Sequence, residues 1–164
     1  KKYIVENIVR HKIIKEFVDE CLENNLTCAI IVDRVTHAES IVKIIPKAII
    51  LHAKTKNRKE IIDKLRHREV QCVITTLFQE AVDIPSLDCV VLAAAGKSSL
   101  RLKQRLRNLT AFEGELRTGY YKKKRAHILY LKDNADFLKS QSAAIISELK
   151  KLVQQHKNNV FLEK

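Results

Sequence analysis

Hydroxyl and amine side chains follow two of the apolar runs in this chain. Thr75 and Thr76 come directly after residues 72–74, and Lys54 and Thr55 follow a second apolar run at a short distance. Threonine hydroxyls, backbone amides and lysine amines at such positions can bind a phosphate group. Each residue also has a local alternative, as a helix cap, a turn residue or a solvated side chain. The spacing therefore predicts phosphate binding, and the surrounding elements must decide between the two roles.

A further phosphate candidate, Gly96-Lys97-Ser98, is similar to the end of a P-loop. It follows a predicted strand and opens a basic helix, whose dipole would favour an anion beside Lys97 and Ser98. A P-loop also requires a glycine five positions before Gly96, and Val91 stands there. We therefore expect no phosphate-gripping loop, no Mg²⁺ site of the usual kind, and no ATP hydrolysis by this domain alone.

The charge of the chain favours a polyanionic partner. The 164 residues carry a net charge of +12, with a pI near 9.6, and the excess is concentrated in two segments. Residues 97–125 hold ten lysines and arginines against two glutamates, and residues 43–68 hold nine against two acidic residues. A solubilising surface would mix the two signs. We therefore expect contact with DNA or RNA.

Other bulk features narrow the class of protein. This length predicts one domain with its own core. No apolar run reaches the roughly 20 residues of a membrane span, and the charged start of the chain lacks the apolar core of a signal peptide. We expect a soluble, intracellular protein of the cytoplasm or nucleus, with no membrane partner. A Lys-, Ile- and Asn-rich composition would also suit a large virus with an AT-rich genome.

The cysteines predict neither a metal site nor a disulfide framework. They form no C-x-x-C pair, and no histidine stands at ligand spacing from any of them. Three fall in or beside apolar segments, where a free thiol behaves as a small hydrophobe. We expect reduced, structural thiols at Cys21, Cys28, Cys72 and Cys89.

Apolar runs that read as buried strands alternate with helical patterns. The alternation predicts right-handed crossovers and a mostly parallel sheet with helices on both faces. The chemistry of such a sheet lies at the carboxyl ends of its strands, so the loops to examine begin near Asp33, His52, Thr75 and Ala93. The expected strands are residues 28–32, 48–51, 72–74, 89–92 and 128–131.

Helical spacing and capping signals place the helices. The first covers residues 4–22, with Val5, Ile8, Val9, Ile13, Phe17, Val18 and Cys21 on its apolar face. A long helix from about Ala135 carries Ile145, Ile146, Leu149 and Leu152 or Val153 on a stripe that should pack on the sheet. The expected caps are Thr36 with Glu39, Asn57 with Glu60, and Ser98 or Ser99.

Four segments, in order, resemble the motifs of the C-terminal RecA-like domain of superfamily 2 helicases. Residues 31–39 are similar to its first motif, and residues 51–55, Leu-His-Ala-Lys-Thr, to the next, usually H-G-K-T. Residues 74–88 resemble motif V, and residues 95–105 lead into motif VI. The similarity covers residues 5–132 and is nearest to the branch of phage and viral repair and transcription helicases.

The resemblance implies an α/β fold, a single RecA-like domain over residues 1–164. It would comprise a leading helix (1–24), a motif-bearing core (25–132) and a C-terminal helix (133–164). The chain would be a fragment of a longer motor that lacks the Walker A and B half. That N-terminal RecA-like half would be its partner and would bring ATP and Mg²⁺.

The same resemblance implies roles for individual residues. Asp83 in motif V would accept a hydrogen bond from the ATP ribose, with Glu80 in register beside it. The local alternative for Asp83 is a turn residue before Pro85. Gln104 and Arg105 would meet the nucleotide from motif VI. The residues that would hold the nucleic-acid backbone are Arg34, His52, Lys54, Thr55, Thr75, Thr76, Lys97 and Ser98.

Motif VI departs from the family pattern after its first two residues. The family has glycine and two arginines where this chain has Arg107, Asn108 and Ala111. Those arginines normally reach the γ-phosphate, and the loss of an arginine finger costs ~10³–10⁵ in rate. A shift of register would bring Arg107 or Arg101 to such a position, and Arg107 is our candidate.

Three functions are open at this point. The first is half of an ATP-dependent helicase or translocase that grips one strand and completes the ATP site from across the cleft. The second is a nucleic-acid-binding module derived from such a motor, with weak or no hydrolysis. The third is an unrelated basic domain for a small phosphorylated ligand. Substrate type, DNA against RNA, is not encoded in backbone contacts.

Overall fold

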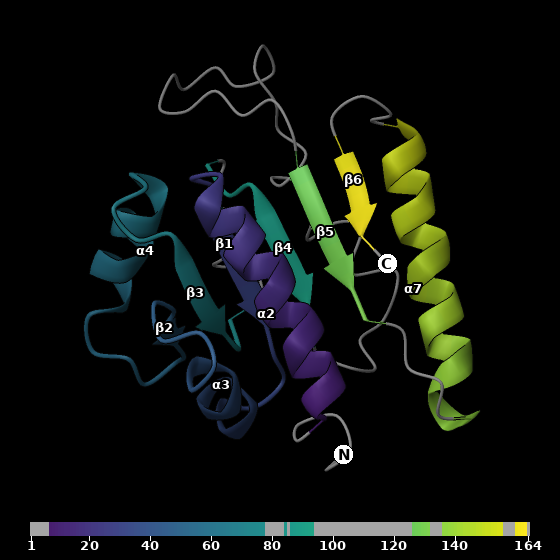
Figure 1. Ribbon diagram of the computed structural model, residues 1–164, viewed down its shortest axis with the longest axis horizontal. Coiled ribbons are helices and arrows are strands. Elements are labelled where there is room, and N and C mark those ends of the chain that lie inside the picture. The colour runs from purple at the N-terminus through teal and green to yellow at the C-terminus, as the bar shows by residue number, and fades with distance from the viewer. Residues whose placement is uncertain are drawn as a thin grey trace.

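A six-stranded parallel sheet forms the centre of the computed structural model (Figure 1). The structure describes residues 7–77, 84, 86–93, 126–131, 136–155 and 160–163. The strands lie in the order β2-β3-β1-β4-β5-β6, and each neighbouring pair is parallel. Their bounds are β1 Cys28–Ile31, β2 Ile49–Leu51, β3 Cys72–Thr75, β4 Cys89–Leu92, β5 Ala126–Tyr130 and β6 Val160–Glu163.

Five of these strands confirm the apolar runs of the sequence. All residues of β1, β3 and β4 are buried, as expected of central parallel strands covered on both faces. The sixth strand, β6, was not predicted, because residues 133–164 were expected to form only a C-terminal helix. Its apolar core of Val160-Phe161-Leu162 is too short to signal a strand, and parallel pairing with β5 gives it hydrogen-bond partners.

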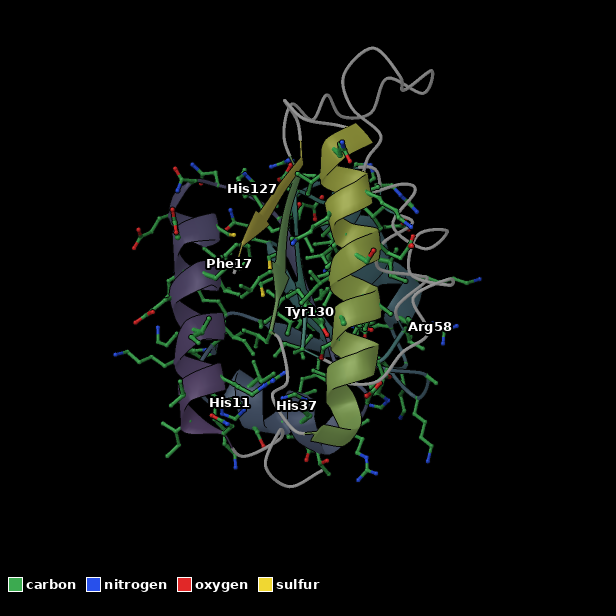
Figure 2. The ribbon with its side chains drawn as sticks, turned by 90° about the vertical axis from the view of Figure 1, so that its right-hand side faces the viewer. His11, Phe17, His37, Arg58, His127 and Tyr130 are labelled. Atoms are coloured by element: carbon green, nitrogen blue, oxygen red, sulfur yellow. The ribbon has the colours of Figure 1, made fainter. Side chains whose placement is uncertain are left out.

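Helices cover both faces of the sheet, as predicted. Helices α2 (Ile8–Glu23) and α3 (Val35–Val42) pack with one apolar cluster, and α4 (Arg58–Arg66) and α7 (Asp136–Gln155) with the other. Figure 2 shows α2 and α7 on opposite sides of the strands. In α7, Ile145, Leu149 and Leu152 are buried, which confirms the predicted stripe. The hydroxyl of Tyr130 donates to Ser142 Oγ at 3.1 Å and ties α7 to β5.

The buried face of α2 differs from the predicted one. Ile14, Val18 and Cys21 contact the sheet, whereas Ile13 is exposed and Ile8 is 82% exposed. The first turn of α2 runs past the carboxyl ends of the strands, so its apolar residues have no sheet to cover (Figure 1). The stripe at i, i+4 and i+7 that does face the sheet begins only at Ile14.

Two predicted caps are wrong in detail. Helix α3 begins one residue before Thr36, so Arg34 is its N-cap and makes no side-chain capping bond. Asn57 does occupy the N-cap of α4, but its side chain makes no capping bond either. Asn7, by contrast, caps α2 by accepting a hydrogen bond from the amide of Arg10 at 3.1 Å. The capping-box spacing at Thr36 was a chance match, since the turn after β1 leads directly into the helix.

Candidate nucleic-acid interface

The predicted phosphate-binding loops begin at the carboxyl ends of the parallel strands, a side of the sheet that we call its carboxyl edge. Because all the strands are parallel, the segments after β1, β2, β3 and β4 leave from the same side. These segments begin at Val32, His52, Thr76 and Ala93. The backbone connects them: the amide of Val32 donates to Thr75 O, and that of Ala93 to Ile31 O. The described part of the chain thus brings together the starts of the four loops that the sequence singled out.

The turn after β2 is held by its own hydrogen bonds. The amide of His52 donates to Thr55 Oγ1 at 3.0 Å, and the amide of Thr55 donates back to His52 O at 3.0 Å. The amide of Lys54 donates to His52 Nδ1 at 3.1 Å. Both backbone amides of Lys54 and Thr55 are therefore used within the turn. What the turn presents outward is the exposed side chain of Lys54.

Cations gather where this turn leads into α4. Lys54, Lys56 and Lys59 are exposed, and Arg58 Nη1 donates to Ala53 O at 3.4 Å. Cations in the first turn of a helix are unfavourable beside the positive end of the helix dipole. The one acidic residue of that turn, Glu60, pairs with Lys64 one turn further on. An anion bound at this point would offset the repulsion between these cations and the positive end of the helix dipole. The turn therefore has the charge that phosphate binding requires.

Several cations of the basic segment 43–68 form ion pairs within the protein or lie away from the candidate interface. Arg68 binds Asp88 at 2.6 Å, Arg66 binds Asp63 at 2.5 Å, and Lys64 binds Glu60 at 2.6 Å. Lys43 and Lys47 precede β2 and so lie toward the opposite edge of the sheet, where Lys47 lines a surface pocket with Lys15 and Asp19. Only the turn 52–59 brings cations of this segment to the carboxyl edge of the strands.

Thr75, the last residue of β3, and Thr76, which follows it, differ in accessibility. Thr75 is fully buried, and its Oγ1 accepts a hydrogen bond from the amide of Leu77 at 2.8 Å. Its hydroxyl therefore stabilises the turn, which is the local role that the sequence left open. Thr76 is half-buried and stands at the same edge as Lys54. Of this pair, Thr76 has the side chain that solvent can reach.

Two further arginines stand at the same edge, of which the sequence predicted Arg34 but not Arg10. Arg10 Nη2 donates to Ala93 O at 3.5 Å, so α2 contacts the end of β4. The ring of His11 stacks on that of His37 with centroids 6.0 Å apart (Figure 2). Arg34, exposed at the start of α3, lies on the loop after β1. The contact of Arg10 joins positions 83 apart, which no local pattern could have indicated.

His37 is neutral in this setting. Burial and, to a smaller extent, the neighbouring His11 and Arg10 together lower its pKa from 6.5 to about 4, while Asp33 acts in the opposite direction. Its Nε2 is buried and makes no hydrogen bond within the described ranges. The stacked imidazole therefore packs as an apolar ring and adds no charge to the interface near pH 7.

The remaining predicted site residues lie outside the described residues. They comprise both motif V candidates, the basic segment after β4 and all of motif VI, namely Glu80, Asp83, Lys97, Ser98, Gln104, Arg105 and Arg107. Within the described ranges, no group of three or more histidines, cysteines and acidic residues is placed to hold a metal ion. None of the helices described there is both long and apolar enough to cross a bilayer.

Comparison with known proteins relates the chain to helicases. No family model matches it. Over 104 residues it is 35% identical to a protein described as "Putative helicase 22" from Sulfolobus islandicus filamentous virus (isolate Iceland/Hveragerdi). The match covers 59% of this chain and 19% of the viral protein, so the chain spans about a fifth of that relative.

Two solved structures have a similar fold. The Hef helicase domain of Pyrococcus furiosus has a TM-score of 0.59 at 22% identity, covering 85% of this chain and 28% of that one. The C-terminal domain of the DEAD-box protein Dbp5 has a TM-score of 0.58 at 18% identity, covering 93% and 81%. The chain therefore has the α/β fold of RecA-like helicase C-terminal domains, and it is similar in sequence to a viral protein described as a helicase.

Proposed function

We propose that this chain is the C-terminal half of an ATP-dependent superfamily 2 helicase or translocase, of the phage and viral branch. In this proposal its carboxyl edge grips the backbone of one nucleic-acid strand. The observation that carries the proposal is the turn 52–59, which presents Lys54, Lys56 and Lys59 at the open N-terminus of α4. The similarity to a viral protein described as a helicase supports the same function.

The geometry favours backbone contact over base recognition. Ammonium groups on a short, hydrogen-bonded turn form point contacts with phosphates, and such contacts carry no sequence information. Hydrogen bonds of His52 and Thr55 already fix the protein backbone of the turn in the absence of nucleic acid. Binding of a nucleic-acid strand therefore requires little further ordering of the turn. Arg34 and Thr76 would extend this contact along the same edge.

The ATP-dependent part of the proposal rests on residues outside the described ranges. Asp83, Glu80, Gln104 and Arg105 would face a nucleotide held by an N-terminal RecA-like partner domain, which would also supply the Mg²⁺ site. Closing of the two halves on ATP would then alternate with strand release. The chain itself has no P-loop sequence, so the isolated domain is expected to hydrolyse no ATP.

A second function is favoured by motif VI. Asn108 and Ala111 stand where the family places its two arginines. A domain without these groups would still hold nucleic acid but would stabilise the transition state of phosphoryl transfer poorly. The alternative is therefore a nucleic-acid-binding module derived from a motor, with weak or no hydrolysis.

The test is direct binding of the domain to fluorescent single- and double-stranded DNA and RNA over a salt series. We expect affinity to fall steeply as salt rises, because each neutralised phosphate releases counterions. Similar affinities for unrelated sequences would support backbone contact. Absence of binding at low salt would refute a grip by this half of the motor alone.

A further inference from the structure

The four cysteines of the chain form one buried cluster. Cys28, Cys72 and Cys89 are each the first residue of a strand, and Cys28 pairs in register with both of the others. Cys21 lies near the end of α2, and all four are free thiols. The sequence predicted reduced, structural thiols but not that they would meet, because the register of three strands is needed to bring them together.

One contact in this cluster is too close for apolar packing alone. Cys21 Sγ lies 3.0 Å from Cys89 Sγ. Even carbon, a smaller atom, packs best at ~3.5–4.0 Å from its neighbours. A disulfide bond is ~2.05 Å long, so about 1 Å of movement separates these thiols from bonding distance. We propose that Cys21 and Cys89 are a redox pair, and that a hydroperoxide oxidises them to a disulfide that joins α2 to β4.

Cys21 is the thiol that an oxidant would reach first. It is 5% exposed, whereas Cys28 and Cys89 are fully buried. Side-chain hydrogen bonds with Cys28 and then with Cys89 lower the pKa of Cys21, although burial opposes them. The same contact with Cys21, together with burial, raises the pKa of Cys89. Since the thiolate is the nucleophile, Cys21 attacks the oxidant and Cys89 resolves the product.

The chemistry balances with hydrogen peroxide as oxidant. The Cys21 sulfur attacks one oxygen, the O–O bond breaks, and the departing hydroxide takes the Cys21 proton as water, leaving a sulfenic acid. The Cys89 sulfur then attacks the Cys21 sulfur, the S–O bond breaks, and hydroxide leaves as a second water with the Cys89 proton. Two thiols and one peroxide thus give one disulfide and two waters. A dithiol reductant reverses the step by thiol–disulfide exchange.

The cross-link would fix a helix to the centre of the sheet. Cys21 and Cys89 are 68 positions apart, so the bond would close a long loop and restrict the unfolded chain. The oxidised domain is therefore expected to unfold at a higher temperature than the reduced domain. The proposal is independent of nucleic-acid binding, since the cluster lies at the edge of the sheet opposite to the turn 52–59.

Peptide mapping of the wild-type chain tests the proposal. The reduced, folded domain is treated with one equivalent of hydrogen peroxide, and the remaining thiols are then alkylated under denaturing conditions. Cleavage after glutamate separates all four cysteines, because Glu23 lies between Cys21 and Cys28, Glu60 between Cys28 and Cys72, and Glu80 between Cys72 and Cys89. We expect a cross-linked peptide pair that holds Cys21 and Cys89 and disappears on reduction. A link between any other pair, or four alkylated thiols, would overturn the proposal.

Matched variants sharpen the assignment. The double variant Cys28→Ala/Cys72→Ala keeps the proposed pair and should still lose two alkylation sites on oxidation. The double variant Cys21→Ala/Cys89→Ala keeps the other two thiols and should lose none. The thermal unfolding midpoint should rise on oxidation only in the wild type and the first variant. Loss of alkylation sites in the second variant would assign the oxidation to Cys28 and Cys72 and refute the proposed pair.

Discussion

Arg68 Nη2 lies 2.6 Å from Asp88 Oδ2, on the edge of the sheet away from the candidate interface. The same carboxylate oxygen accepts hydrogen bonds from the amide of Thr27 at 3.0 Å and from Thr27 Oγ1 at 3.3 Å. The Asp88 side chain is only 3% exposed. Asp88 closes the segment that resembles motif V, yet its contacts join the loops before β1 and β4. The Asp88 carboxylate therefore stabilises the packing of these loops.

Replacing Asp88 with asparagine should destabilise the domain by about 3 kcal/mol. This is the low end for breaking a buried ion pair, since the Arg68 side chain keeps 22% exposure and some hydration. Urea unfolding measures the change. Asp63→Asn is the control, because the exposed pair of Asp63 with Arg66 should contribute less than about 1 kcal/mol. Equal losses in the two variants would contradict a structural role specific to Asp88.

Thr75→Val should destabilise the fold without weakening the binding of a nucleic-acid strand. The change removes the buried hydroxyl oxygen that accepts the Leu77 amide, at a cost of about 1–3 kcal/mol. Thr75→Ser keeps that oxygen and should retain most of the stability. Both quantities can be measured on the same preparations, by denaturant unfolding and by oligonucleotide binding. A variant of normal stability with reduced affinity would instead make Thr75 a strand-binding residue.

His37 should make stability fall as the pH falls. Its pKa is lowered in the folded state to about 4 from 6.5, so the unfolded chain binds the proton more tightly. The contribution is complete above pH ~6.5 and is lost as the pH falls toward 4, by about 1–2 kcal/mol between pH 7 and pH 5. The groups around the ring are His11 and Arg10 on α2 and Asp33 before α3.

The measurement for His37 is urea unfolding at pH 7 and pH 5. His37→Gln cannot take up the proton and should lose most of this pH dependence. His67→Gln is the control, because His67 is exposed on the turn after α4. If His37→Gln kept the full loss of stability between the two pH values, another group would be responsible.

Periodicity predicted the strands well because burial on both faces leaves a clear apolar run. It predicted burial and strand formation less well at positions where tertiary contacts determine them. The exposed first turn of α2 depends on how far that helix passes the sheet, and β6 depends on a free edge at β5. Of the candidate site, the loops at strand ends followed from parallel topology alone. The contact of Arg10 with Ala93 and that of Cys21 with Cys89 required the fold itself.

The sequence also could not separate cations that bind within the protein from cations that face outward. Arg68 and Lys54 look alike in a basic segment, yet one pairs with a buried carboxylate and the other is exposed on a turn. The difference arises because Asp88 is brought to Arg68 from 20 positions away. Segment charge therefore predicts a polyanionic partner but does not indicate which cations would meet it.

The most direct test of the proposed grip is the salt dependence of single-strand binding in two double variants. Lys54→Ala/Lys56→Ala removes cations from the turn after β2, and Lys43→Ala/Lys47→Ala removes two exposed lysines of the same segment that precede β2. We predict that the Lys54/Lys56 variant reduces the magnitude of the negative slope of log K against log salt by ~1.4, about 0.7 for each lost phosphate contact. The Lys43/Lys47 variant should leave this slope unchanged. Equal slopes in the two variants would contradict the assignment of the strand to the carboxyl edge of the sheet.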